Sequence, residues 1–290
     1  MDFAFLLIQL LNGLQYGLLL FLVASGLTLI FGIMGIINLA HGSFYMVGAY
    51  LAWSLASLTG NLLTAILVGI PLTVVLGMAL EWLVIRRFYE RDHLYQVLLT
   101  YGLILVFEEL RSMIWGDDVH GVPVPELLSY SIPLTDTLSY PVYRLFISGV
   151  CLLLAFGLYL LIQRTRLGMM IRAGSSNRDM VQSLGINIKL IYTLIFAMGV
   201  ALAGFAGMIN APLSSVFPNM GGQVLIVCFV VVVIGGMGSI MGSIITGFAL
   251  GVIEGLTKYF YPEASNTVVF VLMVLVLLVK PTGLTGRATT

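Results

Sequence analysis

The chain has 290 residues, of which 60% are hydrophobic and only 9% charged, and its formal net charge is zero. An average soluble domain is about 25% charged, so composition excludes a soluble fold, and the neutral charge gives no indication of nucleic-acid binding. Both cysteines, Cys151 and Cys228, lie inside apolar runs, which argues against a disulfide or a metal site. Asp2 stands where a cleavable signal peptide would carry Lys or Arg, so the first apolar segment is expected to be retained.

Hydrophobic segments long enough to cross a bilayer follow one another along the chain. A spanning helix needs about 20 mostly apolar residues, and no Asp, Glu, Lys or Arg occurs between Phe3 and Leu80. The predicted spans cover residues 5–31, 41–58, 62–85, 94–114, 142–162, 190–209 and 266–279, and the segment 222–256 suits two short spans or one broken helix. We therefore predict an all-α, polytopic integral membrane protein with eight to nine transmembrane helices, folded as one domain over residues 1–290.

Basic residues mark one side of the predicted membrane. Arg86, Arg87 and Arg91 follow the third span, five Arg or Lys residues lie within 163–189, and Lys280 follows the last span. By the positive-inside rule these regions are cytoplasmic, the N-terminus is outside and the C-terminus is cytoplasmic. The segment 115–141, with four prolines and four acidic residues, is predicted to be an external loop.

Glycines interrupt two of the apolar segments in a similar way. Gly32 and Gly35 precede one small-residue helix, and Gly235, Gly236 and Gly238 precede another. Paired glycine-broken segments are typical of transporters built from internal repeats, in which the breaks lie beside the pathway. Close helix packing is the other interpretation, because small residues let helices approach each other in lipid.

Polar residues between the first two spans form a second candidate for a pathway. Asn38 and His41 either line a path or belong to helix capping, since Asn38 stands where the following helix would have its N-cap.

Two pairs of charges are expected near the outer ends of helices. Glu108 and Arg111 are three residues apart and can pair on one helix face, and Glu254 and Lys258, four apart, are predicted to form a surface ion pair. No ionisable residue is evident at the clear centre of a span, which counts against a gradient-driven secondary transporter.

The polar segment 163–189 is too long to be a simple connection between neighbouring spans. Its periodicity predicts two short amphipathic helices, the second capped by Ser176 or Asn177 and ended at Gly185. Such helices either lie in the lipid interface or dock onto a partner protein.

Signatures of catalysis and nucleotide binding are missing from the sequence. It has no Walker A, G-x-S-x-G, H-E-x-x-H or C-x-x-C pattern, and its three histidines are too scattered for a metal site. We expect no catalytic residue, no metal and no cofactor in this chain, so the energy for transport comes from a gradient or from another chain.

Three stretches resemble the permease subunits of the branched-chain (hydrophobic) amino acid ABC importer family. The first runs from Asn12 to Gly42 and includes Asn38-Leu39-Ala40-His41-Gly42. The second runs from Thr165 to Asn187, and the third joins residues 233–242 to the closing segment 278–284. Together they cover nearly the whole chain.

The resemblance implies a bacterial inner-membrane importer of branched-chain amino acids or similar small solutes. Its partners would be two ATP-binding subunits, which bind the ATP and Mg, a second homologous permease and a periplasmic solute-binding protein. The segment 163–189 would couple to the ATPase through the residues Arg166, Gly168, Arg172, Ala173, Asp179, Leu184 and Gly185. Candidate pathway residues are Gln15, Asn38, His41, Gly235, Gly236 and Gly238. The family also serves urea and short amides, so the solute stays open, and a gradient-driven transporter or a channel is the alternative.

Overall fold

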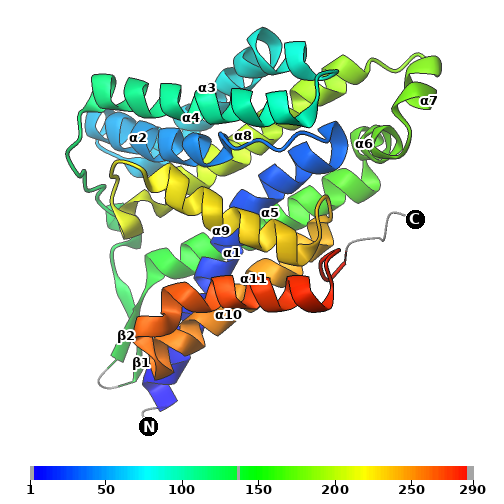
Figure 1. Ribbon diagram of the computed structural model, residues 1–290. Helices are drawn as coiled ribbons and strands as arrows, with labels where there is room; N and C mark the ends of the chain where they lie inside the picture. The colour runs from blue at the N-terminus through cyan, green and yellow to red at the C-terminus, as the bar shows by residue number, and fades with distance from the viewer. Residues whose placement is uncertain (1–2, 136–137, 286–290) are drawn as a thin grey trace.

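The computed structural model describes residues 3–135 and 138–285, which form eleven α-helices and one β-hairpin (Figure 1). The helices are α1 (Phe3–Met34), α2 (His41–Thr59), α3 (Leu62–Leu83), α4 (His93–Trp115), α5 (Val142–Arg164), α6 (Arg166–Ser176), α7 (Arg178–Ser183), α8 (Ile188–Ser214), α9 (Met220–Gly235), α10 (Ile240–Phe260) and α11 (Ser265–Val279). Short 3₁₀ helices are η1 (Ile85–Phe88), η2 (Glu126–Leu128) and η3 (Pro262–Ala264).

Six helices of the described residues are long and apolar enough to cross a membrane, with η1 and η3 extending two of them: α1, α3, α5, α8, α10 and α11. The polytopic helical class is thus confirmed, although the predicted count was eight to nine. Three other helices account for the difference in count. The helix α2 has 19 residues and carries several Ser and Thr side chains, α4 carries three charges near its end, and α9 has only 16 residues.

The chain between α1 and α2 folds back into the bundle (Figure 1). Gly35, with a φ of 68°, follows the last residue of α1, and the Nε2 atom of His41 then donates to the Val23 carbonyl at 2.9 Å. Val23 lies eleven residues before the end of α1, or about 16 Å along its axis. The segment 35–40 therefore brings the start of α2 deep into the protein, where non-helical backbone survives because protein surrounds it.

Asn38 does not cap α2, so that alternative was wrong. Ala40 occupies the N-cap position without a side-chain bond, and Asn38 accepts from the Ala40 N–H at 3.1 Å within the preceding turn. The turn reverses the chain before the helix begins, which places Asn38 two residues too early to cap it.

Glycines allow the central helices to touch backbone to backbone. A Cβ added to Gly13 of α1 would lie 2.3 Å from the Gly251 oxygen of α10, and one added to Gly48 of α2 would lie 2.0 Å from the Gly204 oxygen of α8. Such approach is what small residues permit in lipid, where hydrophobicity no longer drives association. For these glycines the packing interpretation is supported.

The predicted break near residue 236 is confirmed, and the C-terminal segment covers it. α9 ends at Gly235 and α10 begins at Ile240, with φ values of 99° at Gly236 and 81° at Gly238. The backbone N–H groups of Leu284 and Thr285 donate to the carbonyls of Ile234 and Gly235 at 2.7 and 3.2 Å. These bonds satisfy carbonyls that the end of α9 would otherwise leave without partners.

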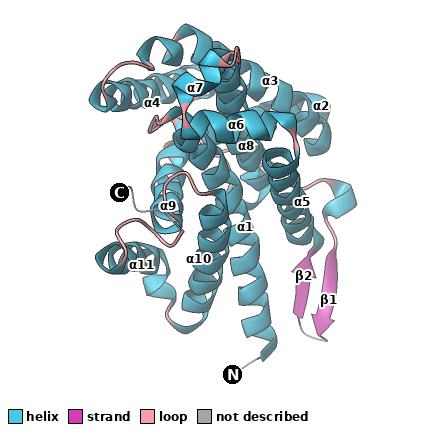
Figure 2. Cartoon of the chain, turned by 90° about the vertical axis from the view of Figure 1, so that its right-hand side faces the viewer, coloured by secondary structure: helices cyan, strands magenta, loops and turns pink. Residues whose placement is uncertain are grey.

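The two ends of the molecule carry different elements. The N-terminus lies at the end that holds the hairpin of β1 (Ser131–Thr135) and β2 (Leu138–Pro141), whereas α6, α7 and the C-terminus lie at the other end (Figures 1 and 2). The two strands pair antiparallel, with Ile132 opposite Tyr140. The segment 115–141, predicted as a loop, therefore contains a hairpin.

Candidate translocation site

Two adjoining cavities open between α1, α8 and α10, with volumes of about 420 and 370 Å³. Binding sites for small molecules commonly have volumes of about 300–1,000 Å³. Four residues line both cavities, namely Tyr16, Asn210, Ser214 and Glu254. The two cavities thus adjoin each other, with this shared group at the junction.

The larger cavity, which we call the apolar chamber, extends from the junction toward α9 and α11. Its walls are mainly aliphatic and aromatic, including Leu19, Val23, Phe217, Val224 and Val269. The chamber has the character of a pocket for an apolar group.

The smaller cavity, which we call the polar chamber, extends from the junction toward α5 and the ends of α1 and α10. The Lys258 ammonium donates to the Glu254 carboxylate at 2.6 Å and lies 5.5 Å from the centre of the Tyr16 ring. Arg144 of α5 donates from Nη1 to the Gln15 Oε1 atom of α1 at 3.3 Å. Both signs of charge therefore line one small cavity.

Glu254 is buried, so the prediction of a surface ion pair with Lys258 was wrong in part. The pair exists, but Glu254 is only 6% exposed. Helical periodicity turns this position of α10 toward α1, while Lys258, one turn nearer the end, reaches the surface with 46% of its side chain exposed. A buried carboxylate therefore lies within α10 and lines the junction, six residues before the end of the helix and not at its centre.

The predicted pathway residues do not come together in the structure. Gln15 lines the polar chamber, whereas Asn38 and His41 are fully buried and line neither chamber. The three glycines of the second break, Gly235, Gly236 and Gly238, approach Gly242, Gly283 and Gly32 respectively. That packing lies at the end of the molecule near the C-terminus, away from both chambers.

Sequence reasoning assigned none of the four junction residues to the pathway. Tyr16 and Asn210 lie at the junction, and Asn210 donates to the Tyr45 hydroxyl at 2.8 Å. A sequence signal existed for Asn210, because an Asn within an apolar helix requires a polar partner. For Tyr16 no comparable signal exists, since tyrosine also occurs on surfaces that face lipid headgroups.

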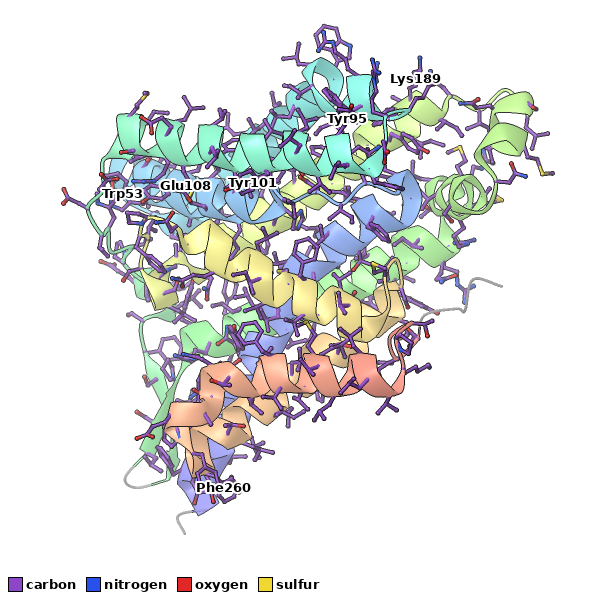
Figure 3. The ribbon with its side chains drawn as sticks, in the orientation of Figure 1. Trp53, Tyr95, Tyr101, Glu108, Lys189 and Phe260 are labelled. Atoms are coloured by element: carbon purple, nitrogen blue, oxygen red, sulfur yellow. The ribbon has the colours of Figure 1, made fainter. Side chains whose placement is uncertain are left out.

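A second buried carboxylate joins three segments near the start of α8. Glu81 of α3 is fully buried and accepts hydrogen bonds from Tyr89, from Thr193 of α8 at 2.5 Å and from Arg86 at 3.3 Å. Burial first, and the bond to Glu81 second, raise the pKa of Tyr89, so its hydroxyl keeps the proton that it donates. Thr193 follows Lys189 by four residues in α8. Figure 3 shows Lys189 at the end of the molecule opposite to Phe260.

The segment 163–189 forms the two predicted short helices, α6 and α7, which lie together at the end of the bundle facing the viewer in Figure 2. Thr165 caps α6 by accepting from the Gly168 N–H at 3.0 Å, and Asn177 caps α7 by accepting from the Met180 N–H at 3.0 Å. Gly185, with a φ of 80°, follows α7 as predicted.

The residues predicted for coupling differ in their surroundings. A Cβ on Gly168 would lie 2.2 Å from the Ile162 oxygen, and Arg172 donates to that same carbonyl, so α6 is held tightly against the last turn of α5. Arg166, Ala173 and Leu184 are exposed, and the side chain of Asp179 lies outside the described residues.

Ion pairs stabilise the C-terminal end of α4, on the side of the molecule opposite to α6 and α7. Arg111 pairs with Glu108 at 3.4 Å, as predicted, and more closely with Asp117 at 2.7 Å. The hydrogen bond from Arg111 lowers the pKa of Asp117 below its ordinary value. His120 stacks on Trp53 with ring centres 3.8 Å apart, and its backbone bridges to Val216.

Helices that span the membrane, glycine-mediated packing and a solute-sized site between the spans define a multi-pass membrane protein of the permease class. Comparison with known families matches residues 9–277 to the family described as the permease component of the branched-chain amino acid transport system. The chain belongs to this family.

Several curated relatives cover nearly the whole chain. The high-affinity branched-chain amino acid transport system permease protein BraD of Pseudomonas aeruginosa is 33% identical, over 96% of this chain and 95% of its own. The corresponding protein LivH of Escherichia coli K12 is 30% identical, over 99% and 97%. The permease protein LivM of the same organism is 28% identical, over 91% of this chain and 67% of its own. No solved structure matches the chain.

Proposed function

We propose that this chain is the membrane-spanning permease subunit of an ATP-driven (ABC) importer of branched-chain amino acids in the bacterial inner membrane. Two ATP-binding subunits hydrolyse the ATP, a periplasmic solute-binding protein delivers the solute, and a second homologous permease completes the path. The coverage of BraD and LivH over almost their full lengths carries this proposal. The likeness to two permeases of one organism, LivH and LivM, supports a pair of related permeases.

The surface formed by α6 and α7 is the proposed contact with the ATPase. Met169, Met180 and Leu184 expose 57%, 61% and 69% of their surface there. Apolar side chains exposed on a polar segment favour a protein partner, and flexible methionines suit such an interface. Cytoplasmic placement of this end also sets the N-terminus outside and the C-terminus inside, in agreement with the basic residues.

Movement of this surface would reach the bundle through rigid contacts. Gly168 and Arg172 hold α6 on α5, and α7 leads within a few residues to α8. Closure of the ATPase pair would then tilt α5 and α8, which carry Arg144 and Asn210 at the two chambers.

The test is co-purification and coupled transport. Expressed with its neighbouring genes, the chain should recover an ATPase in mild detergent, and proteoliposomes should take up leucine on addition of ATP. Gly168→Val should leave the protein inserted but separate ATP hydrolysis from uptake, because the new side chain displaces α6 from α5. The matched control is Gly157→Val, since a Cβ at that glycine of α5 meets nothing within 4 Å.

One observation favours a second function. Glu254 is an ionisable group inside a span, as a proton-driven or sodium-driven transporter requires. In that case the purified chain by itself would concentrate solute in vesicles under an imposed gradient, and ATP would have no effect. Uptake that requires ATP and survives collapse of the gradient would exclude this alternative.

A further inference from the structure

We propose that the two chambers form a transient binding site for a zwitterionic amino acid, with the charged head in the polar chamber and the aliphatic side chain in the apolar chamber. This inference rests on the proposed function as an importer of small solutes. It adds the residues that would recognise the solute and the chemical groups that the solute must carry.

The carboxylate of the solute is the group that the polar chamber suits best. Its lining includes Arg144 and Lys258 as cations against Glu254 as its carboxylate. The bond to Gln15 engages one of the five N–H donors of Arg144, and the bond to Glu254 engages one of the three of Lys258. Both cations therefore retain donors for a ligand carboxylate, which forms strong charge-assisted hydrogen bonds with such groups.

The ammonium group of the solute would be held on the side of Glu254. One carboxylate oxygen of Glu254 accepts from Lys258, which leaves acceptor capacity on the other. The Oδ1 atom of Asn12, also in the wall of the polar chamber, is buried and has no hydrogen-bond partner within the described residues. A buried acceptor without a partner is costly, and an ammonium donor placed between Asn12 and Glu254 would satisfy it.

The apolar chamber accounts for the rest of the solute. The head group would lie at the junction of Tyr16, Asn210 and Glu254, and the side chain would extend past Leu19 toward Val269. Burial of each methylene there favours binding. Urea and short amides carry neither the carboxylate nor the long aliphatic chain, so they would leave the remaining donors of both cations unused and the apolar chamber unfilled.

Protection of an introduced cysteine from chemical labelling measures the occupancy of this site directly. Both native cysteines, Cys151 and Cys228, are buried, so Ser214→Cys, at the junction, provides one reactive thiol for a charged, membrane-impermeant methanethiosulfonate reagent. The variant would be studied in the assembled importer in proteoliposomes. L-Leucine should slow labelling by the factor 1 + [leucine]/Kd. Leucinamide, which lacks the carboxylate, 4-methylpentanoate, which lacks the ammonium, and urea should protect far less.

Charge variants then test the assigned roles. Glu254→Gln and Arg144→Gln, each combined with Ser214→Cys, should weaken protection by leucine about tenfold or more, because each removes a charged hydrogen-bonding group. Glu109→Gln, an exposed carboxylate of α4, is the matched control and should leave protection unchanged. Ser57→Cys, in the exposed last turn of α2, should label at the same rate with and without leucine.

The outcomes separate this inference from the proposed function. ATP-driven leucine uptake without any protection by leucine would overturn the binding site and leave the importer standing. Protection by urea or leucinamide as strong as that by leucine would overturn recognition of the zwitterion. A third outcome is that leucine protects the cysteine and the charge variants abolish this protection, but uptake by the complex does not depend on ATP. That outcome would support the binding site and refute the ATP-driven importer.

Discussion

Replacement of Glu81 should destabilise the protein more than any replacement of an exposed charge. Glu81→Ala removes an acceptor shared by Tyr89, Thr193 and Arg86 in a fully buried place. Loss of one partner of a buried charged pair costs about 3–5 kcal/mol. Glu81→Gln keeps the shape and one acceptor oxygen, so its cost should be nearer 1–2 kcal/mol.

Thermal unfolding of the purified protein in detergent measures both costs. At roughly 2 °C per kcal/mol for a chain of this size, Glu81→Ala should lower the Tm by about 6–10 °C. Glu90→Ala, an exposed carboxylate nearby, is the control and should change the stability by less than about 0.5 kcal/mol.

A double-mutant cycle shows whether the effect acts through the network. Tyr89→Phe and Glu81→Ala should be non-additive, because either change by itself removes the hydrogen bond between Tyr89 and Glu81. Equal Tm values for Glu81→Ala and Glu90→Ala, or full additivity in the cycle, would refute the view that this carboxylate ties α3 to the start of α8.

Three further substitutions test the packing and the external contact. Gly48→Ala should lower the Tm, since its Cβ would lie 2.0 Å from a carbonyl oxygen of α8, whereas Gly102→Ala, with open space around it, should be neutral or slightly stabilising in the same assay. Gly283→Ala should loosen the C-terminal segment, because its φ is 77° and a Cβ would lie 2.6 Å from the backbone of Gly236, directly after α9. Faster proteolysis of the C-terminus checks this. The stability that the Asp117–Arg111 pair contributes should be fully present above about pH 4 and be lost as the pH falls through the lowered pKa of Asp117. The Tm difference between wild type and Asp117→Asn should therefore shrink in acid and in high salt.

Local features of the sequence predicted local structure well. The boundary between the predicted spans 41–58 and 62–85, the break near residue 236 and the pair α6–α7 were all visible as glycine, cap and polarity signals. These signals depend on near neighbours in the chain. Composition likewise determined the membrane class, because so few polar residues cannot cover a surface in water.

Tertiary structure decided which residues meet. The contact of His41 with Val23 and the contacts of Glu81 join positions that are distant in the sequence. The burial of Glu254 depends on which neighbouring helix that position of α10 faces. In a soluble helix an apolar stripe reveals the buried face. In a membrane helix the lipid-facing and protein-facing surfaces are both apolar, so the sequence determined where the helices run, and only their packing determined which faces enclose the two chambers.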